Sequence, residues 1–292
     1  MPDVAVPVTG SVLKWAIAEA GLSVPDLAVR LDTTPETINS WISETSCPNK
    51  SQFDKLIKEL GRPESFFFLA RPPSASSSIA KFRKPPQMGS YQPGPEDLKA
   101  IRHAEDLQRV ARWLAERDNQ RAELVKAHVR DSPEEVADNL RLHLEWSTEE
   151  QIRQADYQVA RALRASIENC GVIALNLTLA EGGPRGFSLP DDVAPVLAIN
   201  TRDDIRARSF SYIHELAHLS LGDRAICEPV PNSATEQWCD DVAGAFLMPK
   251  RILSEYVFTQ LHTRKVSEYE EVRQAANKFA VSLRAMAVRL EV

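Results

Sequence analysis

The chain has 292 residues, 26% of them charged, and a formal net charge of −6 at pH 7. This length can hold two domains, and the acidic balance argues against a general nucleic-acid binder. No apolar run of about 18 residues or more occurs, and the N-terminus lacks the basic start and apolar core of a signal peptide. The four cysteines are widely spaced without a C-x-x-C pair, which is typical of a reducing compartment. We therefore expect a cytoplasmic protein without a membrane segment.

The first part of the chain has the pattern of a compact helical unit. Ser23 and Thr34 are suited to cap two successive short helices, and Pro35 fits the first position of the second one. Two short helices joined by a tight turn and followed by further helix are typical of helix-turn-helix domains. We therefore predict an N-terminal helix-turn-helix bundle over residues 1–75, with helices near 24–31, 35–43 and 51–60.

Residues 21–41, with Pro48 and the helix after it, resemble the phage-repressor-like (XRE) helix-turn-helix domain. In that family the third helix reads the major groove, so the resemblance implies DNA contact through residues 10–60. However, residues 1–75 carry seven Lys or Arg and nine Asp or Glu, a net charge of −2. Because phosphate neutralisation supplies most non-specific DNA affinity, the alternative is a unit that docks a protein or forms a dimer.

The composition changes after the helical unit. A Pro- and Ser-rich stretch predicts a linker over residues 76–95. Apolar residues then recur at threes and fours over 96–128, which predicts one long helix, and Ser147 is suited to start another that ends before Gly171. Three apolar segments separated by turn residues predict a small antiparallel sheet, at 172–177, 186–189 and 195–199. The second part of the chain, residues 96–292, is thus predicted to be a mostly helical α+β domain.

The most informative motif lies in an apolar helix predicted over residues 206–221. His214 and His218 are four residues apart in the sequence His-Glu-Leu-Ala-His, so both imidazoles can face one metal ion. Glu215 projects about 100° away, towards the position where a water on that ion would lie. Zinc binds imidazole nitrogen readily, and a catalytic zinc keeps one position open for water. The motif therefore predicts a zinc hydrolase.

A catalytic zinc needs a third protein ligand. The next predicted helix, over residues 235–248, carries Glu236 and Asp240 four residues apart, so the two carboxylates share a face. We expect Glu236 to bind the ion and Asp240 to hold a ligand histidine in place. Two weaker candidates for the third ligand lie in the loop after the motif: Asp223 and Glu228.

Residues 168–249 resemble the ImmA/IrrE metallopeptidases. The segments that carry the resemblance are Glu168-Asn-Cys-Gly-Val-Ile173, Arg185-Gly-Phe-Ser188, Pro195-Val-Leu-Ala-Ile-Asn200, the motif helix from Phe210 to Gly222, and Glu236-x-x-Cys-x-x-Val-Ala-Gly-Ala-Phe-Leu-Met-Pro249. The resemblance implies a zincin-like domain in which His214, His218 and Glu236 hold Zn²⁺ and Glu215 is the general base. That family often has Asn where this chain has Asp240, so the added negative charge is a departure.

Together, the motif and the two resemblances imply a regulatory protein. The first hypothesis is a zinc-dependent endopeptidase that cleaves a specific protein partner, such as a repressor or a toxin. The alternative is a DNA-binding repressor or antitoxin-like regulator that uses the peptidase fold to bind its partner. A third hypothesis is a structural zinc, which needs a fourth protein ligand that either Cys227 or Cys239 could supply.

Overall fold

The computed structural model describes residues 5–73, 93–222, 225–227, 234–263, 266 and 268–291. By their contacts, the described residues up to Lys99 form one compact unit, and those from Ala100 onward form a second. The boundary between the units falls within helix α6 (Pro95–Arg117). Most of the linker that the sequence predicts lies outside the described residues.

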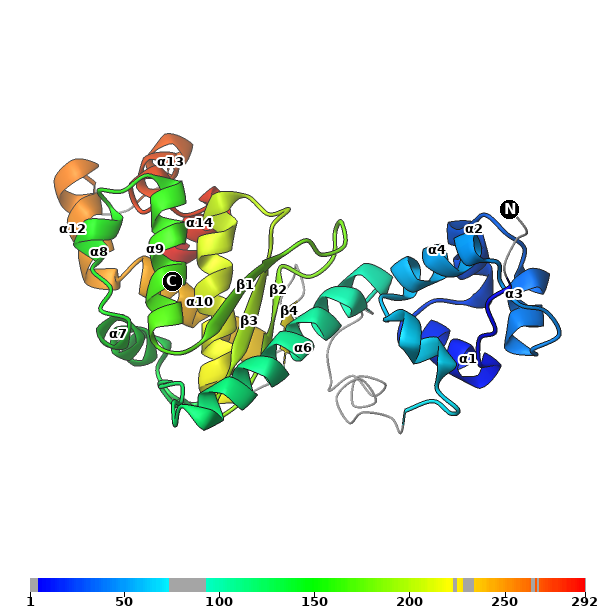
Figure 1. The fold of residues 1–292 in the computed structure, drawn as a ribbon. Coiled ribbons are helices and arrows are strands. Elements are labelled where there is room, and N and C mark those ends of the chain that lie inside the picture. The colour runs from blue at the N-terminus through cyan, green and yellow to red at the C-terminus, as the bar shows by residue number, and fades with distance from the viewer. Residues whose placement is uncertain are drawn as a thin grey trace. The chain divides into compact units, whose positions relative to one another are not determined.

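The first unit is helical throughout its regular structure (Figure 1). Its elements are α1 (Gly10–Glu19), α2 (Val24–Leu31), α3 (Pro35–Ile42), α4 (Lys50–Leu60) and the 3-10 helix η1 (Glu64–Phe68). Ser23 caps α2 in a capping box with Asp26, and the Thr34 hydroxyl accepts a hydrogen bond from the backbone of Thr37 at the start of α3. The predicted helices of this unit are therefore confirmed, whereas its assignment to the XRE type stays a prediction.

The second unit combines helices with one small sheet, as Figure 1 shows, so the predicted mostly helical α+β fold is confirmed. After α6, its helices are α7 (Pro133–His143), α8 (Thr148–Gln151), α9 (Asp156–Asn169), α10 (Ile205–Leu221), α11 (Ala234–Leu247), α12 (Lys250–Gln260), α13 (Tyr269–Lys278) and α14 (Leu283–Glu291). Among the described residues, no helix combines the length and apolar character that crossing a bilayer requires.

The sheet has the order β1-β3-β2-β4, with strands β1 (Ile173–Leu177), β2 (Gly186–Leu189), β3 (Val196–Asn200) and β4 (Ala225–Cys227). Strand β1 is parallel to β3, while β2 is antiparallel to both β3 and β4. The prediction of a small antiparallel sheet is therefore wrong for the pairing of β1 with β3, which is parallel. Apolar runs and turn residues locate strands in the sequence. They do not say which strand lies next to β1, because that depends on how the β2–β3 hairpin packs beside it. Strand β4 was not predicted.

The long helix that the sequence predicts over 96–128 is too long at its C-terminal end. Helix α6 ends at Arg117, and Asn119 adopts a left-handed backbone with φ of 53°. The chain that follows bonds to distant segments, since the backbone N–H of Ala122 donates to Val193 and that of Ala127 donates to Ser220. Long-range partners of this kind outweigh helical periodicity, because a helix would leave those carbonyl groups without them.

Helix α10 lies at the centre of the second unit. It packs against α9 and α11 and against strands of the sheet. The side chain of Asp204 caps its N-terminus, and Gly222, with φ of 72°, ends it in the left-handed conformation that favours glycine. Because partners surround it on several sides, nearly every residue from Ser209 to Ser220 is buried, including polar ones.

Candidate metal centre

Both histidines of the H-E-x-x-H motif point to the same side of α10. Their ring centroids are 5.0 Å apart, and the residues are 7% and 1% exposed for His214 and His218. Buried imidazoles inside an apolar helix need partners, because burying a polar group without one is unfavourable. The backbone of α10 thus places the two rings side by side on one face of the helix.

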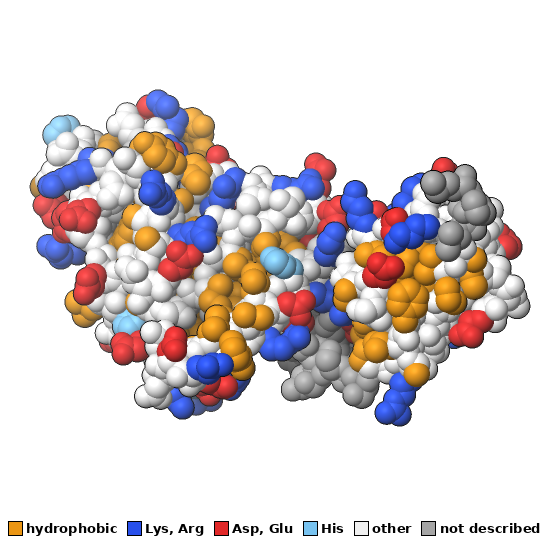
Figure 2. Space-filling model, viewed as in Figure 1, with side chains coloured by type: hydrophobic (Ala, Val, Ile, Leu, Met, Phe, Trp, Pro, Cys, Tyr) orange, Lys and Arg blue, Asp and Glu red, His pale blue; other side chains and the backbone are white. Residues whose placement is uncertain are grey.

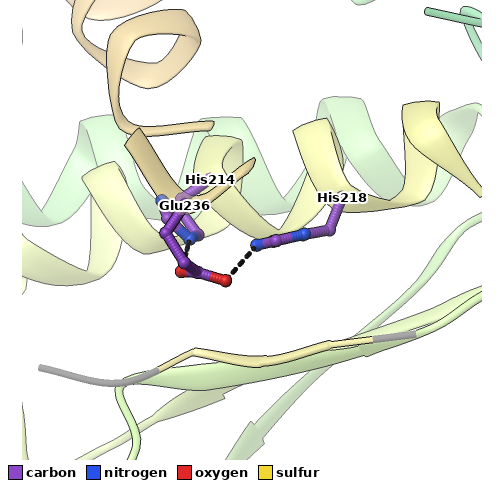
Figure 3. A group of neighbouring side chains, drawn as sticks. All are labelled: His214, His218 and Glu236. Carbon is purple, nitrogen blue, oxygen red and sulfur yellow. Dashed lines mark ion pairs between the residues drawn. The ribbon is translucent and has the colours of Figure 1, made fainter. Parts of the chain in front are cut away.

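Glu236 supplies that partner from a different helix. It stands in the first turn of α11, and its carboxylate lies between the two rings (Figure 3). One carboxylate oxygen is 3.3 Å from Nε2 of His214, and the other is 3.2 Å from Nε2 of His218. The structure therefore brings together the three side chains for which the sequence predicts a shared ion.

The distances between these side chains fit a metal ion. In a tetrahedral zinc site with bonds of about 2.0–2.2 Å, neighbouring ligand atoms are separated by roughly 3.3–3.6 Å. The ligand atoms of His214, His218 and Glu236 all lie within 4.8 Å of one another. Two imidazoles and one carboxylate also form the donor set of a catalytic zinc site, which leaves a fourth position open.

Asp240 lies one turn after Glu236 and contacts the other nitrogen of His214. Nδ1 of His214 donates to Oδ1 of Asp240 at 2.8 Å, which fixes the orientation of the ring. A histidine that binds a metal commonly donates its second N–H to a carboxylate in this way. Asp240 is therefore in hydrogen-bond contact with a histidine for which the sequence predicts a metal-binding role, and its own role stays a prediction.

The carboxylates around His214 favour the protonated, positively charged form of its ring. Burial by itself lowers the pKa of His214, but hydrogen bonds to Asp240 and Glu236 raise this pKa to about 10. For Glu236, burial raises the pKa, yet the hydrogen bonds from the two histidines lower it to about 2. A metal ion needs neutral imidazole, so a cation at this site and the His214 proton compete for the same nitrogen.

Glu215 is fully buried beside the two histidines. It follows His214 directly in α10, and its carboxylate faces strand β2, where Gly186 is its near neighbour. Tyr212 belongs to another face of the helix, because its hydroxyl donates to Asn176 on β1 at 2.7 Å. The two side chains therefore lie against different strands, Glu215 against β2 and Tyr212 against β1.

The other ligand candidates are not brought into this cluster by the described part of the chain. Cys239 is buried in the core of the second unit and does not belong to the group formed by His214, His218 and Glu236. The remaining candidates, Asp223, Glu228 and the side chain of Cys227, lie outside the described residues. The described residues thus give no fourth protein ligand, which a structural zinc would need.

Gly186, for which the sequence predicts no role, lies against Glu215 in the structure. A glycine inside a buried strand often marks a close approach of the backbone to another group, and this signal is present in the segment Arg185-Gly-Phe-Ser188. The identity of the approaching group could not be inferred, because it comes from a separate element.

Comparison with known families supports a peptidase assignment for this part of the molecule. Residues 165–291 match a peptidase family described as the IrrE N-terminal-like domain. The matched region contains α10, α11 and the helices after them, so the part of the chain that holds the cluster is similar to that family. A search of curated proteins gives no match. The family match does not include the first unit.

Proposed function

We propose that the protein is a zinc-dependent endopeptidase with a regulatory role. The observation that carries the proposal is the convergence of His214, His218 and Glu236 from two helices, with the buried Glu215 beside them. Charged side chains are seldom buried unless they are paired or bind a metal, and this cluster buries two imidazoles beside carboxylates. The match to a peptidase family over residues 165–291 supports the same conclusion.

Each residue of the site has a role in this proposal. The two histidines and Glu236 hold the ion, and Asp240 keeps the His214 ring in its binding orientation. Zinc held by these side chains would polarise the scissile carbonyl and lower the pKa of a bound water. Glu215 takes the proton of the attacking water and passes it to the leaving amine. Because Glu215 is buried, its carboxylate acts in a medium where charges interact strongly.

The substrate in this proposal is a specific protein partner in the cytoplasm, such as a repressor or a toxin. This inference rests on the resemblance to the ImmA/IrrE metallopeptidases and on the helical unit that precedes the peptidase region. A separate recognition unit suits an enzyme that acts on one partner, because contacts far from the cleaved bond can select it.

An extract of intact proteins from the cell that makes the protein tests the proposal without a known substrate, because contacts far from the cleaved bond are kept. The zinc-loaded protein should create new N-termini in one or a few proteins of the extract, as mass spectrometry would show. The matched control is Glu215→Gln, which keeps the size of the side chain but cannot accept the proton. We expect this variant to retain zinc and to lose cleavage by about a hundredfold to ten-thousandfold. Equal cleavage by both proteins, or none by either, would refute the assigned mechanism.

A second candidate is a DNA-binding or antitoxin-like regulator, favoured by the two capped helices α2 and α3 of the first unit. The side chains of α3 favour DNA binding less. Its exposed residues include the acidic Glu36 and the neutral Asn39, and the Ser40 hydroxyl already donates to the backbone oxygen of Thr37. On the face shown in Figure 2, acidic and basic side chains are interspersed. Fluorescence anisotropy with DNA from the promoter of the protein's own gene tests this candidate, because nanomolar, salt-sensitive binding would support it.

A further inference from the structure

Gly186 is the first residue of a strand that is buried along its whole length. It pairs with Ile199 on β3 and with Cys227 on β4. Glycine weakens a strand, because it loses more conformational freedom on folding than other residues and contributes no side chain to packing. Its backbone does not need glycine either, since Gly186 is not among the residues with positive φ. The reason for glycine here is therefore the space around it.

That space is taken by the Glu215 carboxylate and by a backbone oxygen of β3. A Cβ atom at position 186 would lie 2.6 Å from Oε1 and 3.1 Å from Cδ of Glu215. It would also lie 2.7 Å from the backbone oxygen of Ala198 on β3. Favourable contacts between non-bonded heavy atoms fall near 3.5–4.0 Å, so even a methyl group would push the carboxylate away from β2.

We propose that Gly186 is a positioning residue for Glu215: the bare backbone of β2 forms a wall against which the carboxylate is held beside the metal ligands. This inference rests on the proposed function. A Glu side chain has three rotatable bonds, and packing against a rigid element limits the orientations that it can adopt. The ligands are affected less, because the atoms nearest a Cβ at position 186 belong to Glu215 and Ala198 rather than to the histidines or Glu236.

The test uses Gly186→Ala in the full chain, with Gly244→Ala as its matched control. Gly244 is also buried in the second unit, but a Cβ there would meet nothing closer than Cδ of Arg289, at 3.8 Å. Both variants are loaded with Co²⁺, whose visible spectrum reports the ligands that hold it. We expect Co²⁺ affinity within about threefold of the unchanged protein for both variants, because His214, His218 and Glu236 remain in place.

Acetohydroxamic acid then probes the position of Glu215 without any peptide substrate. This small chelator releases a proton when it binds a metal, and a correctly placed carboxylate can accept that proton. We expect Gly186→Ala to weaken its binding to the Co²⁺ protein about tenfold or more, which is the typical effect of losing one hydrogen bond to a charged group. Gly244→Ala should leave the binding unchanged.

A shortened carboxylate separates positioning from a general effect on the fold. Glu215→Asp withdraws the carboxylate by one methylene group and thereby leaves room for a methyl group at position 186. The double variant Gly186→Ala with Glu215→Asp should therefore bind the chelator more strongly than the product of the two single effects predicts. If glycine were needed only for the contact with Ala198, the two effects would multiply instead, and the proposal would be overturned.

Failure of a variant to fold, unchanged chelator binding and absent Co²⁺ binding also decide whether Gly186 positions Glu215. If Gly186→Ala does not fold but the double variant does, the carboxylate is the group that requires glycine, and the proposal stands. If neither folds, the backbone contact with Ala198 is the cause, and the proposal is wrong. If Gly186→Ala binds the chelator as the control does, this inference fails while the metal site remains. If the unchanged protein binds no Co²⁺, the proposed function itself fails.

Discussion

In the first unit the hydroxyl groups of Ser23 and Thr34 lie at the surface and cap helices, whereas the second unit buries His214, Glu215 and His218 in its core. Helix capping accounts for the Ser and Thr residues at these positions, because each hydroxyl satisfies a backbone N–H group at the start of a helix. Nothing in the local structure of α10 requires two imidazoles and a carboxylate. Polar residues that a fold does not need are therefore the better guide to function, and here they lie in the second unit.

The difference between the two units is tested most strongly by the variant His218→Gln, which removes one buried imidazole from the second unit. Removing one of two imidazole ligands should reduce zinc affinity by at least about a hundredfold, because the remaining pair cannot complete the donor set. Calorimetric titration with zinc and metal analysis of the purified protein measure the effect. The control is Tyr212→Phe, which alters the same helix on the face that contacts β1. Unchanged zinc affinity in His218→Gln would mean that α10 carries no metal site.

Asp240→Ala tests the support of the ligand His214. Losing the hydrogen bond to Nδ1 should lower zinc affinity about tenfold to a hundredfold, a smaller loss than that of a ligand. The neighbouring acid Asp241, which accepts a hydrogen bond from Gln237 instead, provides the control as Asp241→Ala. Equal zinc affinity in the two variants would show that Asp240 does not orient the ring.

The metal-free protein should show a pH dependence that originates in the second unit. The pKa of His214 is raised to about 10, so its contribution to stability is complete below about 6.5 and is lost as pH rises towards 10. The pKa of Glu236 is lowered to about 2, so its contribution is complete above about 4.5 and is lost as pH falls towards 2. Thermal unfolding should therefore show the highest melting temperature of the second unit between about pH 4.5 and 6.5.

Zinc should change this pH profile, because the ion replaces the proton on His214. Zinc affinity should rise with pH through the range in which His214 loses its proton. Titration in two buffers of different ionisation enthalpy would report the proton released on binding. A melting profile that is identical with and without zinc, or with His214→Gln, would contradict the charge arrangement described for the site.

The smallest expected effect belongs to the first unit. Ser23→Ala removes the cap of α2 and should lower the free energy of unfolding of this unit by about 1 kcal/mol. Zinc affinity should not change. Denaturant unfolding of the full chain measures the first property and zinc titration the second. Ser11→Ala, at an exposed position within α1, is the control. A change in zinc affinity would show that the two units are coupled.

Periodicity and capping patterns predicted some helices well, and they failed where contacts between distant parts of the chain decide the structure. Helix α10 was predicted within a residue because its apolar pattern ends at Gly222, and its histidine spacing follows from helix geometry. Helix α6 was predicted too long, because Ala122 and Ala127 bond to distant carbonyl groups. The parallel pairing of β1 with β3 was missed for the same reason, since neighbouring strands are chosen by packing across the sequence.

By itself, the amino-acid sequence determined helix α10, the caps of α2 and α3 and the shared face of His214 and His218, since each depends on residues within a few positions of one another. Only the tertiary structure decided that Glu236 lies between the two rings and that Gly186 lies against Glu215. The physical reason is that the spacing of side chains within a helix is set by its backbone. The distance between side chains on separate elements is set by how those elements pack around a common core.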